Sequence, residues 1–446
     1  MTIHNNFALF SAAILASTLF FAACSDDSSS APEEKSSHEE ETSHEEQHGH
    51  HMEEPSAGDL TLGDEDIQDG FIFLQDTTIN GVLTVSTTTP GATVLKNVKV
   101  TGNLLIKRSG RVDFSGSADV VHVGSSNTDV YAFEDEAQVN GHHFMGKNNT
   151  FTTKSFAEYQ NVDWTEKSVD LATGIHLAYT VTGDEKGTPV VLIHGLTDGR
   201  VSWSQVAPSL AKKGYRVYVP EYRGNGKTDK PIDESSYSVA ELASDIAAFV
   251  EKLGLKKVHI VGHSLGAFIA QELSITNAEL VSSITLIGSG ASVDKKNATL
   301  DWLVNGTDDE SFDGIYAYDS TQKLPESFIQ AWGYSTNPDK DFQTANLEHL
   351  KQVPYYVWKY LVKNLLKIDN TKRLSSIATD VQIIWGTKDA LFDSESQKTL
   401  QKGLSKAKSV VFHEVEGADH NTHWGSAEDV KTVTGYIDEF IKSLKK

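Results

Sequence analysis

Two different hydrophobic patterns divide the chain near position 155. In residues 58–153, Val, Leu and Ile alternate with Thr, Asn and Lys at a period of about two, and turn residues recur about every 6 to 12 positions. This alternation predicts short β-strands. In residues 156–446, continuous apolar segments alternate with amphipathic, helix-length segments. That order predicts an α/β fold with a mostly parallel sheet.

The alternating region, residues 58–153, is predicted to be a small all-β domain. Segments such as LKNVKVTG and VVHVG repeat one shape, which favours a β-solenoid, but a β-sandwich stays open. The region contains few aromatic residues, which weakens the case for a sugar-stacking surface. A carbohydrate- or surface-binding module and a rigid spacer or assembly domain are equally good interpretations.

The pattern in the second region predicts a leading hairpin, further strands, and helices before and after an insertion at 291–377. Helices and strands in this alternation predict a sheet that is covered on both faces. The hairpin spans 169–182; the strands are 189–195, 215–224, 257–266, 283–288, 380–386 and 409–416; the helices are 204–212, 238–253 and 427–444.

The pentapeptide GHSLG at 262–266 is the strongest indication of a catalytic residue in the sequence. It follows the apolar segment VHIV and precedes AFIAQELS, an apolar-periodic helix. A G-x-S-x-G motif in this context predicts a sharp turn that lifts Ser264 above the sheet edge as a nucleophile. The helix N-terminus then directs the N–H of Leu265 at a developing oxyanion.

Three further segments stand in a fixed order around this turn. HGLT at 194–197 follows the strand PVVLI, the strand VQIIW leads through GTK to Asp389, and the last strand leads through EGAD to His420. A nucleophile, an acid and a histidine in this chain order are the order of an α/β-hydrolase triad.

Together the four motifs resemble the α/β-hydrolase superfamily over about 290 residues, 156–446, and the chain is identified as a capped, esterase-like serine hydrolase. The resemblance implies an eight-stranded, mostly parallel sheet with helices on both faces. It implies Ser264, Asp389 and His420 as catalytic residues and the backbone N–H groups of Leu196 and Leu265 as the oxyanion hole. No metal or organic cofactor is implied.

Two positions of the triad have competitors. Asp393 is a second candidate for the acid, although its place before a helix is typical of an N-cap. His423 competes with His420 for the role of base. The family usually has a small residue immediately before this histidine, where the chain has Asp419, a second carboxylate that can raise the basicity of the imidazole.

A fifth segment limits the reactions that the chain can be expected to catalyse. PEYRGNGKTDKP at 220–231 resembles the D-x-R-G-x-G-x-S-x-x-P loop of the dehalogenase, epoxide-hydrolase and C–C-hydrolase branch, with Glu221 in place of Asp and a structural Arg223. Dehalogenases and epoxide hydrolases use Asp as the nucleophile at the elbow, because an alkyl-enzyme ester must form there. Ser264 cannot form such an ester. Carboxylic ester hydrolysis through an acyl-enzyme is therefore predicted. C–C bond, lactone and peptide or amide hydrolysis stay open, as does a catalytically silent surface binding protein.

The insertion at 291–377 is, by resemblance, a helical cap over Ser264. It is rich in aromatic residues, among them Trp302, Trp332 and Trp358. Such residues more often form the core of a cap than the wall of a pocket, but their density predicts a site for an apolar or aromatic acyl group of modest size.

The first 24 residues predict export. Phe7 to Ala23 is largely apolar and ends in small residues, which is typical of a signal peptide over 1–23. FAAC at 21–24 resembles the lipobox of bacterial lipoproteins, with Phe21 where Leu is usual, and implies a lipid on Cys24. The predicted location is therefore the membrane of a bacterial cell envelope; a plain signal peptide is the alternative. Cys24 is the single cysteine, so no disulfide framework is available.

Residues 25–57 are predicted to be a disordered, Ser-, Glu- and His-rich linker. Their histidines suit either a loose metal site or, as we favour, a solvated tether. Of the net charge of −23, most lies between Ser25 and Gly70, which hold 16 acidic residues and one Lys. Nothing in this balance favours nucleic acid as a partner. The predicted partners are a small ester or related acyl substrate, the membrane, and possible cell-wall or polysaccharide contacts of the β-region.

Overall fold

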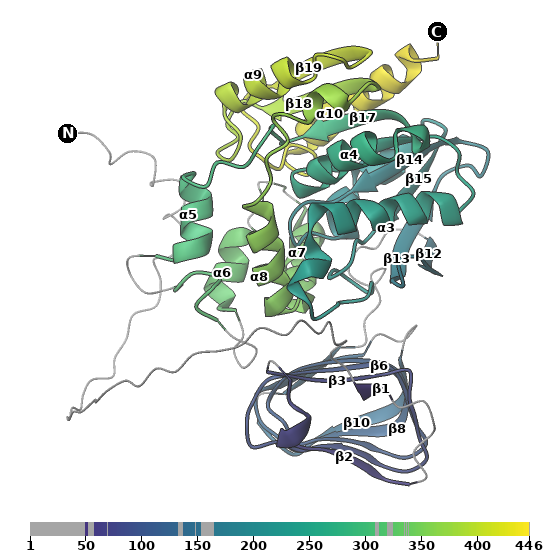
Figure 1. Ribbon diagram of the computed structural model, residues 1–446, viewed down its shortest axis with the longest axis vertical. Coiled ribbons are helices and arrows are strands. Elements are labelled where there is room, and N and C mark those ends of the chain that lie inside the picture. Colours follow the sequence, from purple (N-terminus) through teal and green to yellow (C-terminus); the bar gives the residue numbers. More distant parts are fainter. Residues whose placement is uncertain are drawn as a thin grey trace, which may run out of the picture. The chain divides into compact units, whose positions relative to one another are not determined.

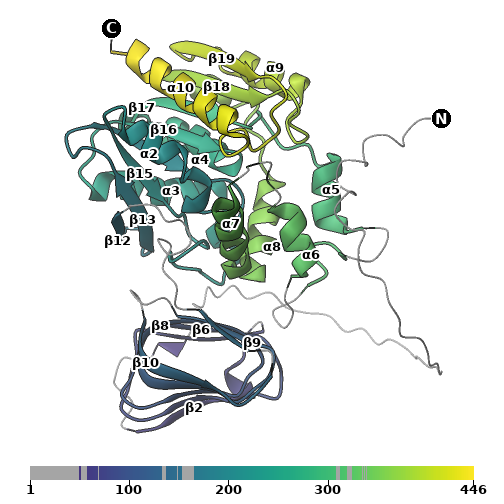
Figure 2. The same ribbon diagram turned by 180° about the vertical axis from the view of Figure 1, so that it is seen from behind.

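The computed structural model describes two regions of regular structure (Figures 1 and 2). The predicted signal peptide, Cys24 and nearly all of the linker lie outside the described residues. The residues described are 50–51, 58–68, 70–132, 137–147, 149–152, 165–307, 312–318, 324–333, 335, 337 and 339–445.

The β-region is a parallel β-solenoid. Leu60 pairs with Leu83, Leu83 with Leu104, and Leu104 with Val121, so each coil takes about 20 residues. Every pairing between its strands is parallel in the described part of the chain. A β-sandwich built from hairpins would pair antiparallel, so the register decides between the two predicted alternatives.

Period-two alternation builds the interior of the solenoid. Leu83, Val85, Leu104 and Ile106 are fully buried, and the residues between them face outward. The strands are β1 (His50–His51), β2 (Leu60–Leu62), β3 (Phe71–Gln75), β4 (Thr78–Ile79), β5 (Leu83–Val85), β6 (Ala92–Val100), β7 (Leu104–Ile106), β8 (Gly110–Val123), β9 (Thr128–Tyr131), β10 (Ala137–Phe144) and β11 (Thr150–Thr152).

The α/β region contains the predicted eight-stranded sheet, in the order β12-β13-β15-β14-β16-β17-β18-β19. The predicted hairpin is β12 with β13, and β13 also pairs antiparallel with β15; the remaining pairs are parallel. The strands are β12 (Thr165–Asp170), β13 (His176–Thr182), β14 (Thr188–Ile193), β15 (Tyr215–Pro220), β16 (Val258–His263), β17 (Val281–Ile287), β18 (Asp380–Gly386) and β19 (Ser409–Val415).

Helices cover both faces of this sheet, as Figure 1 shows. Helices α3 (Val239–Lys252), α4 (Leu265–Thr276) and α9 (Ser394–Gly403) contribute to one apolar cluster, and α2 (Val206–Ala211) and α10 (Ala427–Ser443) to the other. Ser238 caps α3 by accepting a hydrogen bond from the Glu241 amide. The predicted fold class is confirmed. The strand predicted at 215–224 is shorter than expected, because β15 ends at Pro220, before the loop that carries Arg223.

The described part of the insertion between β17 and β18 contains the α-helices α5 (Ala298–Asn305), α6 (Glu326–Trp332), α7 (Lys340–Gln352) and α8 (Tyr355–Leu365). Their aromatic side chains pack on one another. The ring of Phe328 is 4.3 Å from that of Phe312 and 5.2 Å from that of Trp358, centroid to centroid. Phe328 and Trp358 are buried, so these aromatics form the core of the insertion. Within the described residues, no helix combines the length and apolar character that a membrane span needs.

Candidate active site

Ser264 stands on a strained turn between β16 and α4. Its backbone has φ 51° and ψ −116°, a conformation that is costly for a residue other than glycine. The amide of Ser264 donates to the carbonyl of Ile287 at 2.9 Å. A Cβ atom at Gly262 would collide with the Gly266 carbonyl, and one at Gly266 with the Ile193 carbonyl. The two glycines of the motif are therefore required by close backbone contacts.

The loop after β14 forms a second tight turn beside this elbow. Thr197 adopts φ 57°, and the Tyr222 hydroxyl donates to the Gly195 carbonyl at 2.5 Å. Within the described residues, neither the Leu196 amide nor the Leu265 amide donates a hydrogen bond to another group. The backbone N–H groups of Leu196 and Leu265 are therefore suited to donate hydrogen bonds to an oxygen atom of a substrate.

His420 and Asp389 form a buried pair at the same edge of the sheet. His420 Nδ1 lies 3.0 Å from Asp389 Oδ2, and the side chain of Asp389 is fully buried. Burial alone would lower the pKa of His420, but the adjacent Asp389 carboxylate raises it above the ordinary value. Asp389 and His420 follow β18 and β19, and Ser264 follows β16; these strands run parallel, so all three residues lie at their carboxyl ends.

Within the described residues, no hydrogen bond joins the Ser264 hydroxyl to His420, whose Nδ1 faces Asp389. In proteins without substrate such contacts are often long and tighten when a substrate binds.

The two competing residues have other surroundings. Asp393 is the N-cap of α9, as its sequence context predicts, and accepts a hydrogen bond from the Ser396 amide at 2.9 Å. The ring of His423 is fully buried against Trp203, at 4.3 Å between centroids. Burial and the neighbouring histidines lower the pKa of His423 far below the ordinary value. Neither Asp393 nor His423 therefore has surroundings like those of the buried pair of Asp389 and His420.

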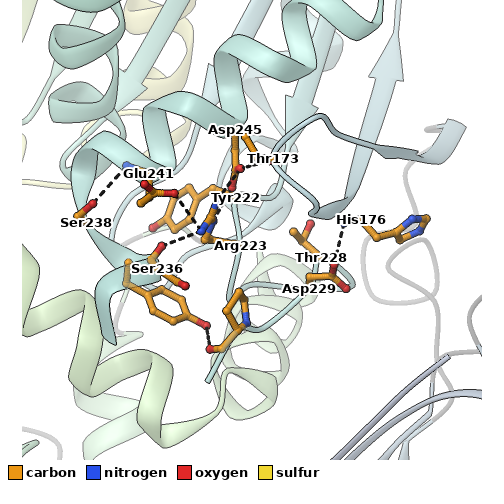
Figure 3. Close-up of polar contacts among 12 residues, drawn as sticks. Thr173, His176, Tyr222, Arg223, Thr228, Asp229, Ser236, Ser238, Glu241 and Asp245 are labelled. Carbon is orange, nitrogen blue, oxygen red and sulfur yellow. Dashed lines mark hydrogen bonds and ion pairs between the residues drawn. The ribbon is translucent and has the colours of Figure 1, made fainter. Parts of the chain in front are cut away.

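Arg223 holds the loop that follows β15 (Figure 3). Its guanidinium makes two bonds to Asp245, Nε to Oδ2 at 2.6 Å and Nη2 to Oδ1 at 2.7 Å, and donates to the Ser236 carbonyl at 3.1 Å. Thr173 donates to the same carboxylate. A buried, bidentate pair of this kind fixes loop geometry.

Glu221, which replaces the usual Asp of this loop motif, is fully buried and pairs with Arg200, Nε to Oε2, at 3.1 Å. Burial raises the pKa of Glu221, but the charge and backbone amide of Arg200, together with the neighbouring His349 and His194, outweigh burial and lower the pKa to about 2. The pair fastens the segment after the HGLT turn to the segment after β15.

Sequence reasoning missed two buried polar residues beside these loops, Asp198 and His349. Asp198 is 6% exposed and His349 5%. A Cβ atom at Gly199 would collide with the His349 ring, so helix α7 of the insertion packs tightly on the loop that follows HGLT. The only signal in the sequence is a charged residue directly after HGLT, and nothing local marks His349. No set of three or more His, Cys, Asp or Glu side chains suited to a metal ion occurs within the described ranges.

Comparisons with known proteins define the class. A family model described as the alpha/beta hydrolase fold matches residues 188–427, more than half of the chain. The protein therefore belongs to the α/β-hydrolase fold family and is a hydrolase of that fold.

Individual relatives differ in the reactions that their names state. "Epoxide hydrolase 1" of Caenorhabditis elegans is 26% identical over 322 residues, which cover 68% of this chain and 77% of the relative. A 2-hydroxy-6-oxononadienedioate/2-hydroxy-6-oxononatrienedioate hydrolase of Pseudomonas putida is 27% identical over 292 residues, 61% of this chain and 93% of the relative. Among solved structures, the esterase RhEst1 from Rhodococcus sp. aligns with a TM-score of 0.52 at 22% identity, covering 63% of this chain and 99% of the esterase. At that identity the likeness shows the fold alone.

Proposed function

We propose that this protein is a serine hydrolase that cleaves carboxylic esters through an acyl-enzyme, with Ser264, His420 and Asp389 as its catalytic residues. The observation that carries the proposal is the elbow, where a serine rather than a carboxylate holds the strained conformation at φ 51°. The buried pair of His420 and Asp389 at the same sheet edge supports it, because a histidine oriented by a carboxylate is the base that a serine nucleophile needs.

The steps follow from this arrangement. His420 takes the proton of Ser264 as the hydroxyl oxygen attacks the carbonyl carbon, and the amides of Leu196 and Leu265 hold the oxyanion. His420 then gives the proton to the departing alcohol, which leaves the acyl group on Ser264. Water, losing a proton to His420, attacks the acyl carbon, and the serine oxygen leaves and regains its proton.

Epoxide opening fits this nucleophile poorly, although one relative bears that name. Attack on an epoxide carbon by Ser264 would leave an ether on the enzyme. An ether has no carbonyl carbon for water to attack, so the enzyme would not turn over. A carboxylate nucleophile avoids this end point because it forms an ester.

C–C bond hydrolysis is the second candidate. It is favoured by the extent of the match to the Pseudomonas putida hydrolase, of which 93% is covered. Lactone and peptide or amide hydrolysis remain chemically open on the same three residues.

The test is hydrolysis of p-nitrophenyl esters, acetate through octanoate, by the full-length protein and its Ser264→Ala variant. We expect turnover that the substitution abolishes, and the preferred chain length measures the acyl site. Ser274→Ala is the matched control, because Ser274 lies on the same helix, α4, and its hydroxyl donates to the Ala270 carbonyl within that helix. Turnover that survives Ser264→Ala contradicts the proposal. Labelling of Ser264 by a fluorophosphonate without ester turnover would favour the C–C hydrolase, and no labelling the silent binding protein.

We also propose that a lipid on Cys24 anchors the exported protein to a bacterial envelope membrane, and that the solenoid contacts cell wall or polysaccharide. The sequence FAAC supports the first part. Incorporation of labelled palmitate into the wild-type chain, lost in Cys24→Ser, tests it. Pull-down on isolated cell walls with and without residues 58–153 tests the second part.

A further inference from the structure

A second buried histidine stands beside the proposed base. His263, the last residue of β16, is 2% exposed. Its Nε2 lies 3.1 Å from the backbone carbonyl oxygen of His420, and its Nδ1 lies 3.6 Å from Asp198 Oδ2. The rings of His263 and His420 are 4.9 Å apart between centroids.

His263 lies where three segments of the chain meet. Asp198 belongs to the loop that carries the Leu196 amide, His263 directly precedes Ser264, and His420 belongs to the loop after β19. A Cβ atom at Gly195 would lie 2.7 Å from Asp198 Oδ2 and 2.8 Å from His263 Nδ1, so the HGLT turn closes directly over the pair. The relative position of these loops decides whether the proposed nucleophile, base and oxyanion donors meet.

The hydrogen on His263 follows from its partner. A backbone carbonyl only accepts, so Nε2 must carry the hydrogen and donate it. The carbonyl of His420 is also confined on its other side, because a Cβ atom at Gly288 would lie 2.9 Å from that oxygen and 3.1 Å from His420 Nδ1. The main chain of His420 is thus held between a donor and a glycine.

We propose that His263 is a positioning residue that donates to the His420 carbonyl, holds the His420 main chain and so keeps the His420 imidazole against Asp389 and in reach of Ser264. The inference rests on the proposed function for its catalytic meaning, but the contact itself is independent of the reaction. A displacement of about 1 Å in such a group can lower the rate about 100-fold.

The experiment compares His263→Leu with His263→Gln in the full-length protein. Gln keeps an N–H donor near the carbonyl and Leu does not. We expect kcat for p-nitrophenyl esters to fall about 100-fold in His263→Leu with KM nearly unchanged, and to recover at least about 10-fold in His263→Gln. The matched control is His259→Leu, because His259 is buried on the same strand and its Nδ1 lies 2.7 Å from the Ser283 hydroxyl, away from His420.

A readout without turnover separates the two proposals. Titration of His420 by NMR reports on its contact with Asp389. The other titratable groups near His420 are Asp198, Asp419, His263 and His423. We expect the pH midpoint of the His420 titration to fall in His263→Leu, because the contact between His420 and Asp389 loosens. In His263→Gln and His259→Leu the midpoint should be unchanged.

If the pH midpoint of the His420 titration is unchanged in His263→Leu, the positioning role is overturned. It is also overturned if His259→Leu loses as much kcat as His263→Leu, or if His263→Gln does not restore kcat. If the wild type neither turns over nor is labelled at Ser264, the proposed function fails, and the NMR midpoint still decides the role of His263.

Discussion

Asp389 faces His420 with both carboxylate oxygens, which lie 3.0 and 3.1 Å from His420 Nδ1. The carboxylate itself is fixed by two backbone amides, since Oδ1 accepts from Leu391 at 2.8 Å and Phe392 at 3.0 Å. The orientation of the imidazole is therefore set by the backbone of the loop after β18.

Asp389→Asn should remove the charge and leave the shape. The amide can present an N–H to His420 Nδ1 and so favours the wrong tautomer, and kcat should fall about 10⁴-fold. Asp393→Asn, four residues away, should keep its capping role on α9 and change kcat by less than about twofold. Ester hydrolysis rates of both variants check this, and equal losses would show that the loop rather than the charge is responsible.

The pH profile should report the raised pKa of His420. His420 must be neutral to accept the serine proton, so kcat/KM should fall as the pH drops through its pKa, and the midpoint should lie above 6.5 because the Asp389 carboxylate favours the charged ring. Asp389→Asn should move the midpoint to lower pH. Measurement of kcat/KM from pH 5 to 9 checks both; a midpoint at or below 6.5 in the wild type would count against the pairing.

Glu221 should stabilise the fold in a pH-dependent way. Its pKa is lowered from 4.5 to about 2, so its contribution is present above about pH 4.5 and is lost as the pH falls towards 2. Glu221→Gln should lower the free energy of unfolding by about 3 kcal/mol at pH 7, and the difference should shrink in acid.

Denaturant unfolding of both proteins at pH 7 and pH 3 measures this effect. Glu234→Gln is the control, because Glu234 pairs with Lys363 at a half-exposed site and should cost about 0.5 kcal/mol. A difference that does not depend on pH would mean that packing, rather than charge, accounts for the role of Glu221.

Gly266→Ala should disrupt the elbow. The added Cβ would press on the Ile193 carbonyl, which must move together with the HGLT loop. We expect loss of ester turnover and a loss of stability of about 1–3 kcal/mol. Gly435→Ala on α10 meets no atom within 4 Å and should stabilise by about 0.5–1 kcal/mol. Thermal unfolding and turnover of the two variants check the contrast.

The positions of the strands in the sheet could be predicted because each strand is marked locally, whereas their order was given only by the structure. Strand β18 has the predicted bounds, Asp380–Gly386, since a short segment rich in apolar residues that ends at a glycine is typical of a buried strand. The solenoid could not be separated from a sandwich in the same way. Alternation at period two buries one face in either case, and only the register, Leu60 with Leu83 and Leu83 with Leu104, distinguishes them.

The sequence by itself determined the candidates Ser264, Asp389 and His420, because each stands at a strand end in a short motif whose spacing is local. Only the tertiary structure decided that Asp198 and His263 lie beside the proposed base, and that Glu221 pairs with Arg200. The reason is physical. A buried polar contact forms between side chains that are far apart in the chain, and its existence depends on the distance and desolvation that folding creates.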